Sequence, residues 1–363
     1  MTFSRPPERG AEVIIGVGGI GSGIFFELEG NHNLGREESR AGTLLDRADY
    51  CKLHIIFHYL AALLSGDDAP RLVPVGRVGN DPEGRRLVSM MADAGMDISS
   101  VQTVPDQNTL FSVCFQYPDG AGGNITTSND AGVTLTPKDV LKLDGLFHKH
   151  KGKGIAVAAP EVPLEVRAAL LELATAHKFF RAASFTTGEI VEGLDTGMFR
   201  MIDLVGLNED EARTAAGTGG DDPDDKSWIN RCIEQLWSIN PAMMVSITLG
   251  AEGSVAAANG RLEIAPALVP PRVASTAGSG DAHLAGLVAG LSRGLPLIGN
   301  EERRESYNRS PLASAHDLAL LVASMSVTSA DTINMEINRE TLMSYAEETG
   351  IGLSAELVDS LKL

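Results

Sequence analysis

The sequence predicts an α/β fold in which a mostly parallel sheet is covered by helices on both faces. Short apolar runs, each long enough for one strand, alternate with helical patterns along almost the whole chain, which is the order typical of parallel sheets. With 363 residues and 43% hydrophobic composition, the chain can bury one large core. We therefore expect one main domain, which extends from residue 11 to residue 363.

The expected strands are short, and turn residues separate them from the expected helices. Strands are expected at residues 12–17, 24–30, 75–78, 113–117, 124–127, 154–159, 202–207, 243–248, 254–258 and 262–264. Helices are expected at residues 49–64, 85–94, 166–176, 228–237, 279–291 and 316–328. The runs 113–117 and 124–127 flank a turn rich in Pro, Asp and Gly, and this pattern predicts a β-hairpin.

Composition and charge narrow the class of protein. A formal net charge of −18 disfavours nucleic acid and anionic membranes as partners, because both would repel the chain. The three cysteines are widely spaced and odd in number, which favours a reducing compartment over a disulfide framework. No apolar run approaches the roughly 20 residues of a spanning helix, and the first ten residues lack the apolar segment of a signal peptide. We expect a cytoplasmic protein.

A glycine turn follows the first expected strand and fits the G-x-G-x-x-G template of dinucleotide-binding proteins. Its glycines are Gly16, Gly18 and Gly21. The dinucleotide-binding version needs a helix directly after the glycines. Residues 24–30 are instead rich in aromatic residues and predict a strand. A nicotinamide-dependent oxidoreductase is therefore the less favoured alternative.

The stretch 275–281, Ser-Thr-Ala-Gly-Ser-Gly-Asp, carries the strongest sign of chemistry. It opens a helical pattern, and its small residues Gly278, Ser279 and Gly280 allow a ligand to approach the unpaired N–H groups of the first turn. Asp281 stands beside this anion hole and could act as a general base in phosphoryl transfer. The structural alternative is that Asp281 only stabilises the positive end of the helix dipole.

Cys51, His54 and His58 fall on one face of the helix expected at 49–64. Their side chains are possible metal ligands by type, but the two histidines lack the glutamate of an H-E-x-x-H motif and have apolar neighbours. We expect no metal site here. Core packing or contacts with substrate hydroxyls are the favoured roles of the two histidines.

The sequence Ser-Thr-Ala-Gly-Ser-Gly-Asp-Ala-x-x-Ala-Gly-Leu at 275–287 resembles the C-terminal signature of the ribokinase-like (PfkB) carbohydrate and nucleoside kinases. The stretch 75–84, which contains G-R-V-G-N-D-P-E-G, is similar to a second motif of that family. The resemblance implies a three-layer ribokinase-like fold with a small β lid, contributed here by about 24–50 and 110–128. It also implies transfer of the γ-phosphoryl group of ATP to a hydroxymethyl group, with Asp281 as the base. A homodimer formed through the lid is left open.

The resemblance extends to the nucleotide side of the site. Asn208 and Glu211 match a family motif that organises phosphates and hydrated Mg²⁺, and the stretch Thr248-Leu-Gly-Ala-Glu-Gly253 is similar to the family's nucleotide loop. We expect Thr248, Gly250 and Gly253 to bind ATP. No Walker A motif is present, which excludes a P-loop kinase.

The family's sugar-binding motifs are not evident in this chain. Gly23 stands where relatives have an Asp that holds sugar hydroxyls, and residues 50–56 replace a glycine turn. We therefore expect other substrate contacts, namely Asn31, His54, His58 and Glu161. Such a set predicts a neutral sugar or nucleoside, because amides and neutral imidazoles both donate and accept hydrogen bonds. For Glu161, a solvated acid at a helix N-terminus is an equally favoured alternative.

Two questions stay open at the level of the sequence. Relatives often bind a monovalent cation beside the anion hole with an Asp and carbonyls, and Ser275 and Ala277 stand in that segment here. A kinase-like binding protein without turnover also remains an alternative, because the sugar motif departs from the family pattern while Asp281 could persist as a helix cap.

Overall fold

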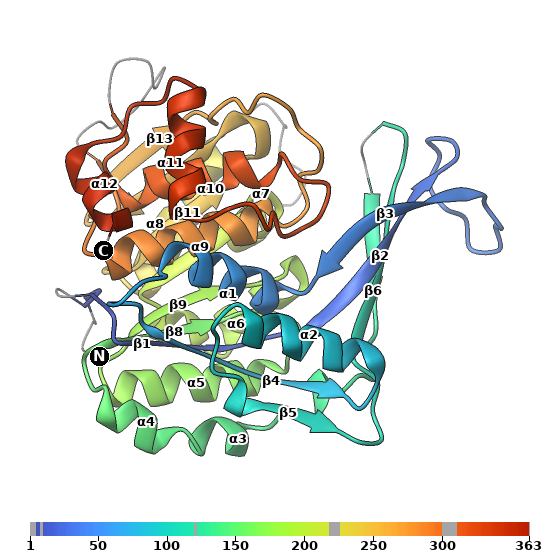
Figure 1. Ribbon diagram of the computed structural model, residues 1–363, viewed down its shortest axis with the longest axis horizontal. Helices are drawn as coiled ribbons and strands as arrows, with labels where there is room; N and C mark the ends of the chain where they lie inside the picture. Colours follow the sequence, from blue (N-terminus) through green and yellow to red (C-terminus); the bar gives the residue numbers. More distant parts are fainter. Residues whose placement is uncertain (1–4, 8–9, 120–121, 218–225, 300–310, 363) are drawn as a thin grey trace.

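The computed structural model describes residues 5–7, 10–119, 122–217, 226–299 and 311–362 (Figure 1). Its strands are β1 (Val13–Val17), β2 (Gly21–Leu28), β3 (Gly42–Tyr50), β4 (Arg71–Gly79), β5 (Val101–Val104), β6 (Leu110–Gln116), β7 (Gly122–Thr126), β8 (Gly154–Ala158), β9 (Phe180–Ser184), β10 (Leu204–Asn208), β11 (Met244–Thr248), β12 (Ser254–Ala258) and β13 (Arg261–Ala265). Its α-helices are α1 (Lys52–Leu63), α2 (Pro82–Asp93), α3 (Pro137–Leu141), α4 (Asp144–Lys149), α5 (Leu164–Ala176), α6 (Ile190–Asp195), α7 (Glu209–Ala215), α8 (Ser227–Ile239), α9 (Ser279–Ser292), α10 (Ala315–Ser326), α11 (Arg339–Glu348) and α12 (Ala355–Lys362).

The main sheet has nine strands in the order β13-β12-β11-β10-β9-β8-β1-β4-β5. All neighbours from β11 to β5 are parallel, whereas β12 and β13 add an antiparallel edge. Parallel neighbours need helical crossovers, which is why helices alternate with the strands along the chain. The predicted α/β class with a mostly parallel sheet is confirmed.

Helices cover both faces of this sheet and make two separate cores. Along β1, Ile14 packs in the core that contains α1, α9 and α10, whereas Val13 and Ile15 pack in the core that contains α5 and α8. Successive side chains of a strand point to opposite faces, so both faces of β1 are buried. Figure 1 shows the resulting layers, with α9 and α10 on one side of the sheet and α4 and α5 on the other.

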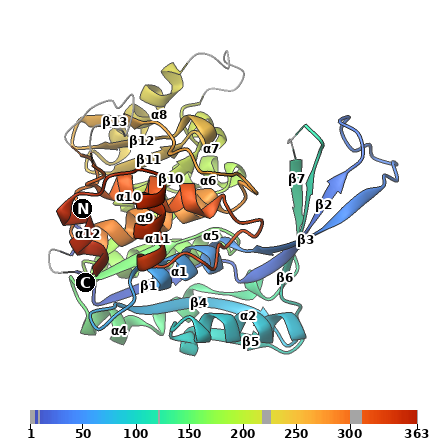
Figure 2. The same cartoon turned by 45° about the horizontal axis from the view of Figure 1, so that its top comes forward.

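A second, four-stranded sheet has the order β3-β2-β6-β7. Figures 1 and 2 show it projecting from the body of the molecule beyond the end of the main sheet. It is built from the two regions expected to form a lid, although residues 120–121 lie outside the described residues. The expected hairpin is present as β6 and β7, which pair antiparallel from Ser112↔Thr126 to Gln116↔Gly122.

The helix expected at 49–64 was placed too early in the chain. Residues 42–50 form β3, and the helix begins only at Lys52 after Cys51, whose backbone is extended. The apolar, helix-like spacing from Tyr50 onward concealed this boundary. Asp49 and Tyr50 are held in a strand because they pair with Gly23 and Ser22 of β2.

β9 is a second difference from the sequence expectation. Its sequence Phe-Arg-Ala-Ala-Ser is interrupted by Arg181, which hides the apolar run although the residue is buried. The Arg181 guanidinium forms a buried ion pair with Asp203, with an N···O distance of 2.7 Å. This pairing balances the buried charge of Arg181, so an arginine can lie in a buried strand of the main sheet.

The glycine turn at 16–21 leads directly into β2, as expected. β2 starts at Gly21 and pairs in parallel with β6 from Gly21↔Leu110 onward. No helix follows the glycines, so the geometry that a dinucleotide-binding turn requires is not formed. In the part of the chain that the structure describes, no helix is long and apolar enough to cross a membrane.

Candidate active site

Two cavities lie side by side where the main sheet meets the four-stranded sheet. Cavity A, of about 560 Å³, is lined by residues of β2, β3, β6 and β7 together with residues 273–278. Cavity B, of about 460 Å³, lies at the ends of β10 and β11 beside the start of α9. Both cavities are lined by Lys52, Thr276, Gly278 and Asp281, so these four residues mark the junction between them.

The first turn of α9 is shaped by Gly278. This residue has φ = 77°, and a Cβ atom there would collide with the Thr332 carbonyl, so only glycine fits. Gly280 differs, because a Cβ atom on it would meet no other atom within 4 Å. Ser279 and Gly280 line cavity B, and Gly278 lines both cavities.

The N–H groups at this turn are only partly occupied. Ser279 donates its N–H to the Thr276 carbonyl at 3.3 Å. Within the described ranges, the N–H groups of Gly278, Gly280 and Asp281 have no hydrogen-bond acceptor. Such N–H groups at the positive end of a helix suit an anion. The expected anion hole is therefore available through Gly278 and Gly280, whereas the Ser279 N–H is already bonded.

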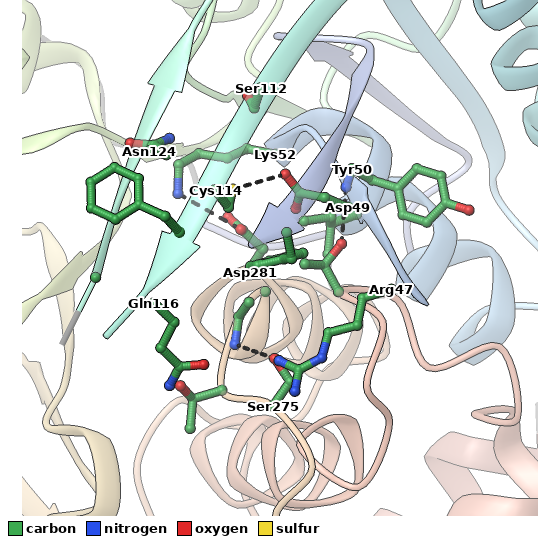
Figure 3. Close-up of a pocket in the computed structure, with 18 of the residues that line it drawn as sticks. Arg47, Asp49, Tyr50, Lys52, Ser112, Cys114, Gln116, Asn124, Ser275 and Asp281 are labelled. Atoms are coloured by element: carbon green, nitrogen blue, oxygen red, sulfur yellow. Dashed lines mark hydrogen bonds and ion pairs between the residues drawn. The ribbon is translucent and has the colours of Figure 1, made fainter. Parts of the chain in front are cut away.

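Asp281 forms the centre of the junction. The Lys52 Nζ atom lies 3.7 Å from its Oδ2 atom, and a dashed line marks this ion pair in Figure 3. Burial raises the pKa of Asp281, and the Lys52 ammonium counteracts this rise. Asp281 in turn raises the pKa of Lys52, so the lysine remains charged. The Lys52 ammonium thus favours the ionised form of this buried carboxylate.

Glu161, which the sequence predicted as a substrate contact, lines cavity A, but its carboxylate is engaged with the protein. Its Oε2 atom accepts the N–H of Lys52 at 2.9 Å at the start of α1. Its backbone has φ = 72°, which is uncommon for a residue with a side chain. Burial raises the pKa of Glu161 to about 7. Glu161 therefore positions Lys52 and could also face a substrate in cavity A.

Asn208 and Glu211 both line cavity B and bind each other. Asn208 caps α7 by accepting the Glu211 N–H at 2.9 Å, and Glu211 accepts the Asn208 N–H at 2.8 Å. This capping box is a sufficient structural reason for the N-x-x-E pattern. Burial raises the pKa of Glu211 to about 7, so a cation in cavity B would favour its ionised form.

The nucleotide-loop residues separate into two groups. Thr248 and Gly250 line cavity B, and Gly250 has φ = 57°. Gly253 does not line it. A Cβ atom on Gly253 would collide with the Ala265 carbonyl, which explains the glycine by packing.

The donor set suits a hydrated Mg²⁺ ion better than a tightly chelated metal. Among the described residues, no group of three or more His, Cys, Asp or Glu side chains is arranged to hold a metal ion. Asn208, Asp210 and Glu211 nevertheless line cavity B, where the oxygens of Asn208 and Glu211 already accept hydrogen bonds within the capping box. Mg²⁺ keeps several waters and is bound by few carboxylates together with phosphates, which fits these residues.

Three residues expected to touch the substrate do not line cavity A. Asn31 lies in the connection after β2, where its Oδ1 atom accepts the Asp119 N–H at 3.0 Å. His54 and His58 are buried within α1, and their rings stack with centroids 4.5 Å apart. His58 borders a separate cavity of about 200 Å³. Burial lowers the pKa of His58 to about 4, so its ring is neutral and packs in the core.

Asp49 is a residue of cavity A that the sequence did not point to. It is the register partner of Gly23, and its Oδ2 atom lies 2.5 Å from where a Cβ atom of Gly23 would be. The Asp49 carboxylate therefore lies where a side chain at position 23 would begin. Cys114 donates its thiol to this Asp49 oxygen at 3.3 Å (Figure 3). Burial raises the pKa of Asp49.

A signal for Asp49 was present in the sequence. In the stretch Leu45-Asp-Arg-Ala-Asp49, residues 45, 47 and 49 share one face if the segment is a strand. The helix expected from residue 49 obscured this alternation. No sequence pattern predicted a role for Lys52. It comes close to Asp281 only because two helices that are more than 200 residues apart in the sequence pack together.

Comparison with known proteins agrees with this geometry. The profile of the pfkB family carbohydrate kinases matches residues 71–339. A bifunctional ribokinase/ribose-5-phosphate isomerase A from Fructilactobacillus sanfranciscensis is 25% identical over 288 residues, which cover 78% of this chain and 49% of the relative. The chain thus spans about half the length of that relative.

Solved structures share the fold at low sequence identity. The ribokinase of Cryptococcus neoformans var. grubii, solved in complex with ADP, has a TM-score of 0.72 and 18% identity, and the similarity covers 92% of this chain and 99% of that one. A nucleoside kinase of Burkholderia thailandensis, solved with inosine, has a TM-score of 0.67 and 16% identity, with coverages of 92% and 98%. The profile match extends over well more than half of the sequence, and the chain therefore belongs to the pfkB family of carbohydrate kinases.

Proposed function

We propose that this protein is an ATP-dependent kinase that phosphorylates a hydroxymethyl group of a sugar or nucleoside-like substrate, with Asp281 as general base. The observation that carries the proposal is the junction of two cavities at Asp281 and Lys52. Phosphoryl transfer needs a donor and an acceptor to meet in line at one point. Two cavities that share one buried carboxylate suit this requirement.

Cavity B is the proposed nucleotide site. Its lining includes Thr248 and Gly250 of the expected nucleotide loop, together with the first turn of α9. The unbonded N–H groups of Gly278 and Gly280 would stabilise charge on the transferring phosphoryl group. Bound Mg²⁺ would neutralise phosphate charge, and Asn208 and Glu211 are the residues that would hold it through water.

Cavity A is the proposed acceptor site. Asp281 would accept the proton of the attacking hydroxyl in its ionised form, which the Lys52 ammonium favours. The Lys52 ammonium also borders cavity B and would attract the transferring phosphoryl group. Asp49 would accept hydrogen bonds from other hydroxyls of the acceptor.

The four-stranded sheet is the proposed lid over the acceptor. Cavity A is bordered by Phe25 of β2, Cys114 of β6 and Asn124 of β7, so this sheet forms one wall of the site. Closure would exclude water from the transfer step. Leu44 and Ile125 are exposed apolar residues on the same sheet and offer a surface for the homodimer that the family resemblance left open.

A monovalent cation could bind beside the first turn of α9, and an experiment can test this. Ser275 and Ala277 line cavity A and border the anion hole, and their carbonyls are the candidate ligands. Activity measured in K⁺ and in tetramethylammonium salts of equal ionic strength would decide whether a cation is used there.

Acceptor-dependent ADP formation is the test of the proposed function. The purified protein is incubated with Mg·ATP and a panel of sugars, sugar derivatives and nucleosides, and the phosphorylated product is located by ³¹P NMR. A phosphate monoester on a hydroxymethyl carbon is the expected product. Binding of panel members without any ADP formation would instead favour a kinase-like binding protein, and failure to bind ATP would refute the nucleotide site.

A further inference from the structure

Arg47 occupies an irregular point of β3 that directs it to cavity A. The register runs from Gly23↔Asp49 to Phe25↔Leu45, so β3 has two more residues than β2 across this step. Such a bulge changes the direction of side chains and is common beside active sites. Arg47 is the middle residue of the bulged segment, and it lines cavity A.

The backbone around Arg47 is held firmly by the C-terminal part of the chain. The N–H of Ala48 donates to the Asp331 Oδ1 atom at 2.7 Å, and the Ala48 carbonyl accepts the N–H of Thr332 at 3.1 Å. Tyr50 also donates its N–H to the Thr332 hydroxyl at 3.0 Å. These hydrogen bonds hold the bulged backbone in place, so Arg47 projects from an anchored position.

The guanidinium of Arg47 has no protein partner in the described part of the chain. It makes no hydrogen bond, ion pair or ring contact there, although the residue is half-buried. The other cation of cavity A, Lys52, is paired with Asp281. In Figure 3 Arg47 reaches towards Ser275, away from Lys52. A guanidinium that extends from an anchored backbone and lines a cavity, without a carboxylate partner, is suited to an oxyanion of a ligand.

We propose that Arg47 binds an oxyanion of the acceptor, so that the substrate is a polyhydroxylated anion with either a carboxylate or a phosphate monoester. This inference rests on the proposed function and assigns the substrate class of cavity A. The acceptor would place its hydroxymethyl group at Asp281, its middle hydroxyls near Asp49 and its anionic end at Arg47. It departs from the neutral sugar or nucleoside that the sequence predicted, because that prediction relied on Asn31, His54 and His58.

Pairs of acceptors that differ only in the anionic group test this assignment. Gluconate and sorbitol share the hydroxyls of carbons 2 to 6 and differ in a carboxylate at carbon 1. Fructose 6-phosphate and fructose differ in the phosphate, and both keep a free hydroxymethyl group at carbon 1.

The phosphorylation rate and the Kd from calorimetry are measured for each compound. We expect at least one anion to exceed its neutral counterpart roughly 10- to 100-fold in kcat/KM, as a charge-assisted bidentate contact allows. The pair that shows this preference identifies the carboxylate or the phosphate as the anion.

Substitution of Arg47 then tests whether this residue binds the anionic group of the acceptor. Arg47→Gln should raise KM and Kd for the preferred anion roughly 10- to 100-fold, leave the KM for ATP unchanged, and leave the neutral counterpart almost unaffected. Arg47→Lys should restore part of the loss, because it keeps the charge without the bidentate geometry. Arg85→Gln is the matched control, since Arg85 is exposed on α2 and lines neither cavity.

The outcomes separate the inference from the proposed function. A preference of the wild-type protein for neutral acceptors, with no effect of Arg47→Gln, would overturn the inference and leave the kinase assignment intact. Arg47-dependent binding of an anion without ADP formation would support the inference and refute the kinase assignment. Equal losses of affinity for the anion in Arg47→Gln and Arg85→Gln would show that only the net charge of the protein matters for anion binding, and would also overturn the inference.

Discussion

At the scale of single residues, the pair Lys52–Asp281 decides what the site can do. A carboxylate buried at the start of a helix would otherwise tend to stay protonated, because burial raises its pKa. Lys52 opposes this tendency from 3.7 Å away. Glu161 holds the backbone of Lys52 in turn, so three residues distant in sequence set the surroundings of the proposed base.

Asp281→Asn should abolish turnover and spare the nucleotide site. A positioned general base contributes about 10²- to 10⁴-fold, so kcat should fall by that factor, whereas the Kd for ATP should stay within a few-fold. The measurements are steady-state ADP formation and calorimetric ATP binding. Glu340→Gln, an exposed first-turn acid on α11, serves as the control. A variant that keeps a tenth or more of the wild-type kcat would exclude Asp281 as the base.

Lys52→Met should shift the pH dependence of activity upward. The active form of Asp281 is ionised, and Lys52 lowers its pKa, so removal of the ammonium raises that pKa further. Activity is lost as the pH falls through this pKa, and the acid limb of the kcat profile should therefore move to higher pH in the variant. An unchanged acid limb would mean that another group titrates there.

At the scale of elements, the turn that begins α9 depends on two glycines for different reasons. Gly278 has a left-handed backbone and contacts the Thr332 carbonyl, so it serves the conformation. Gly280 has open space beside it and lines cavity B, so its lack of a side chain leaves room for a ligand. The same residue type therefore has a structural role at one position and a proposed binding role two positions later.

Substitution by alanine should separate these two roles. Gly278→Ala should lower Tm, with a cost of about 1 kcal/mol or more in free energy of unfolding, because alanine is strained at positive φ and meets Thr332. Gly280→Ala should leave Tm unchanged or slightly higher, since alanine favours the helix, while the KM for ATP rises. Thermal unfolding with parallel kinetics gives both readouts. Equal Tm values for the two variants would contradict the assignment for Gly278.

At the scale of the whole molecule, the parallel sheet is the fixed part and the four-stranded sheet is the proposed moving part. The main sheet is buried on both faces by two cores. The four-stranded sheet projects from it (Figure 2), and Leu44 and Ile125 of this sheet are exposed. Segments with little buried contact area open most easily, so motion on binding is expected in the smaller sheet.

Hydrogen exchange should detect closure of this sheet. Addition of an acceptor that the protein phosphorylates, together with a non-hydrolysable ATP analogue, should slow amide exchange in residues 42–50 and 110–116 several-fold. Residues 254–258 of β12, which border neither cavity, provide the internal reference. Equal protection in β3, β6 and β12 would indicate general stabilisation by ligand, and would argue against a lid.

The sequence by itself determined the alternating α/β order, the parallel sheet, the glycine turn at Gly278–Asp281 that opens a helix, and the family. These features depend on local patterns: apolar runs, small residues before a helix and a motif with fixed spacing. The same local signals located Thr248, Gly250, Asn208 and Glu211, which the structure gathers around cavity B.

Only the tertiary structure decided which residues line cavity A, the proposed acceptor site. His54 and His58 were favoured because their types suit hydroxyls, yet the packing of α1 places them in the core. Asp49, Arg47 and Lys52 come to the cavity because β3 pairs with β2 across a bulge and α1 packs on α9. Strand register and helix packing bring together residues far apart in sequence, and no local pattern records those contacts.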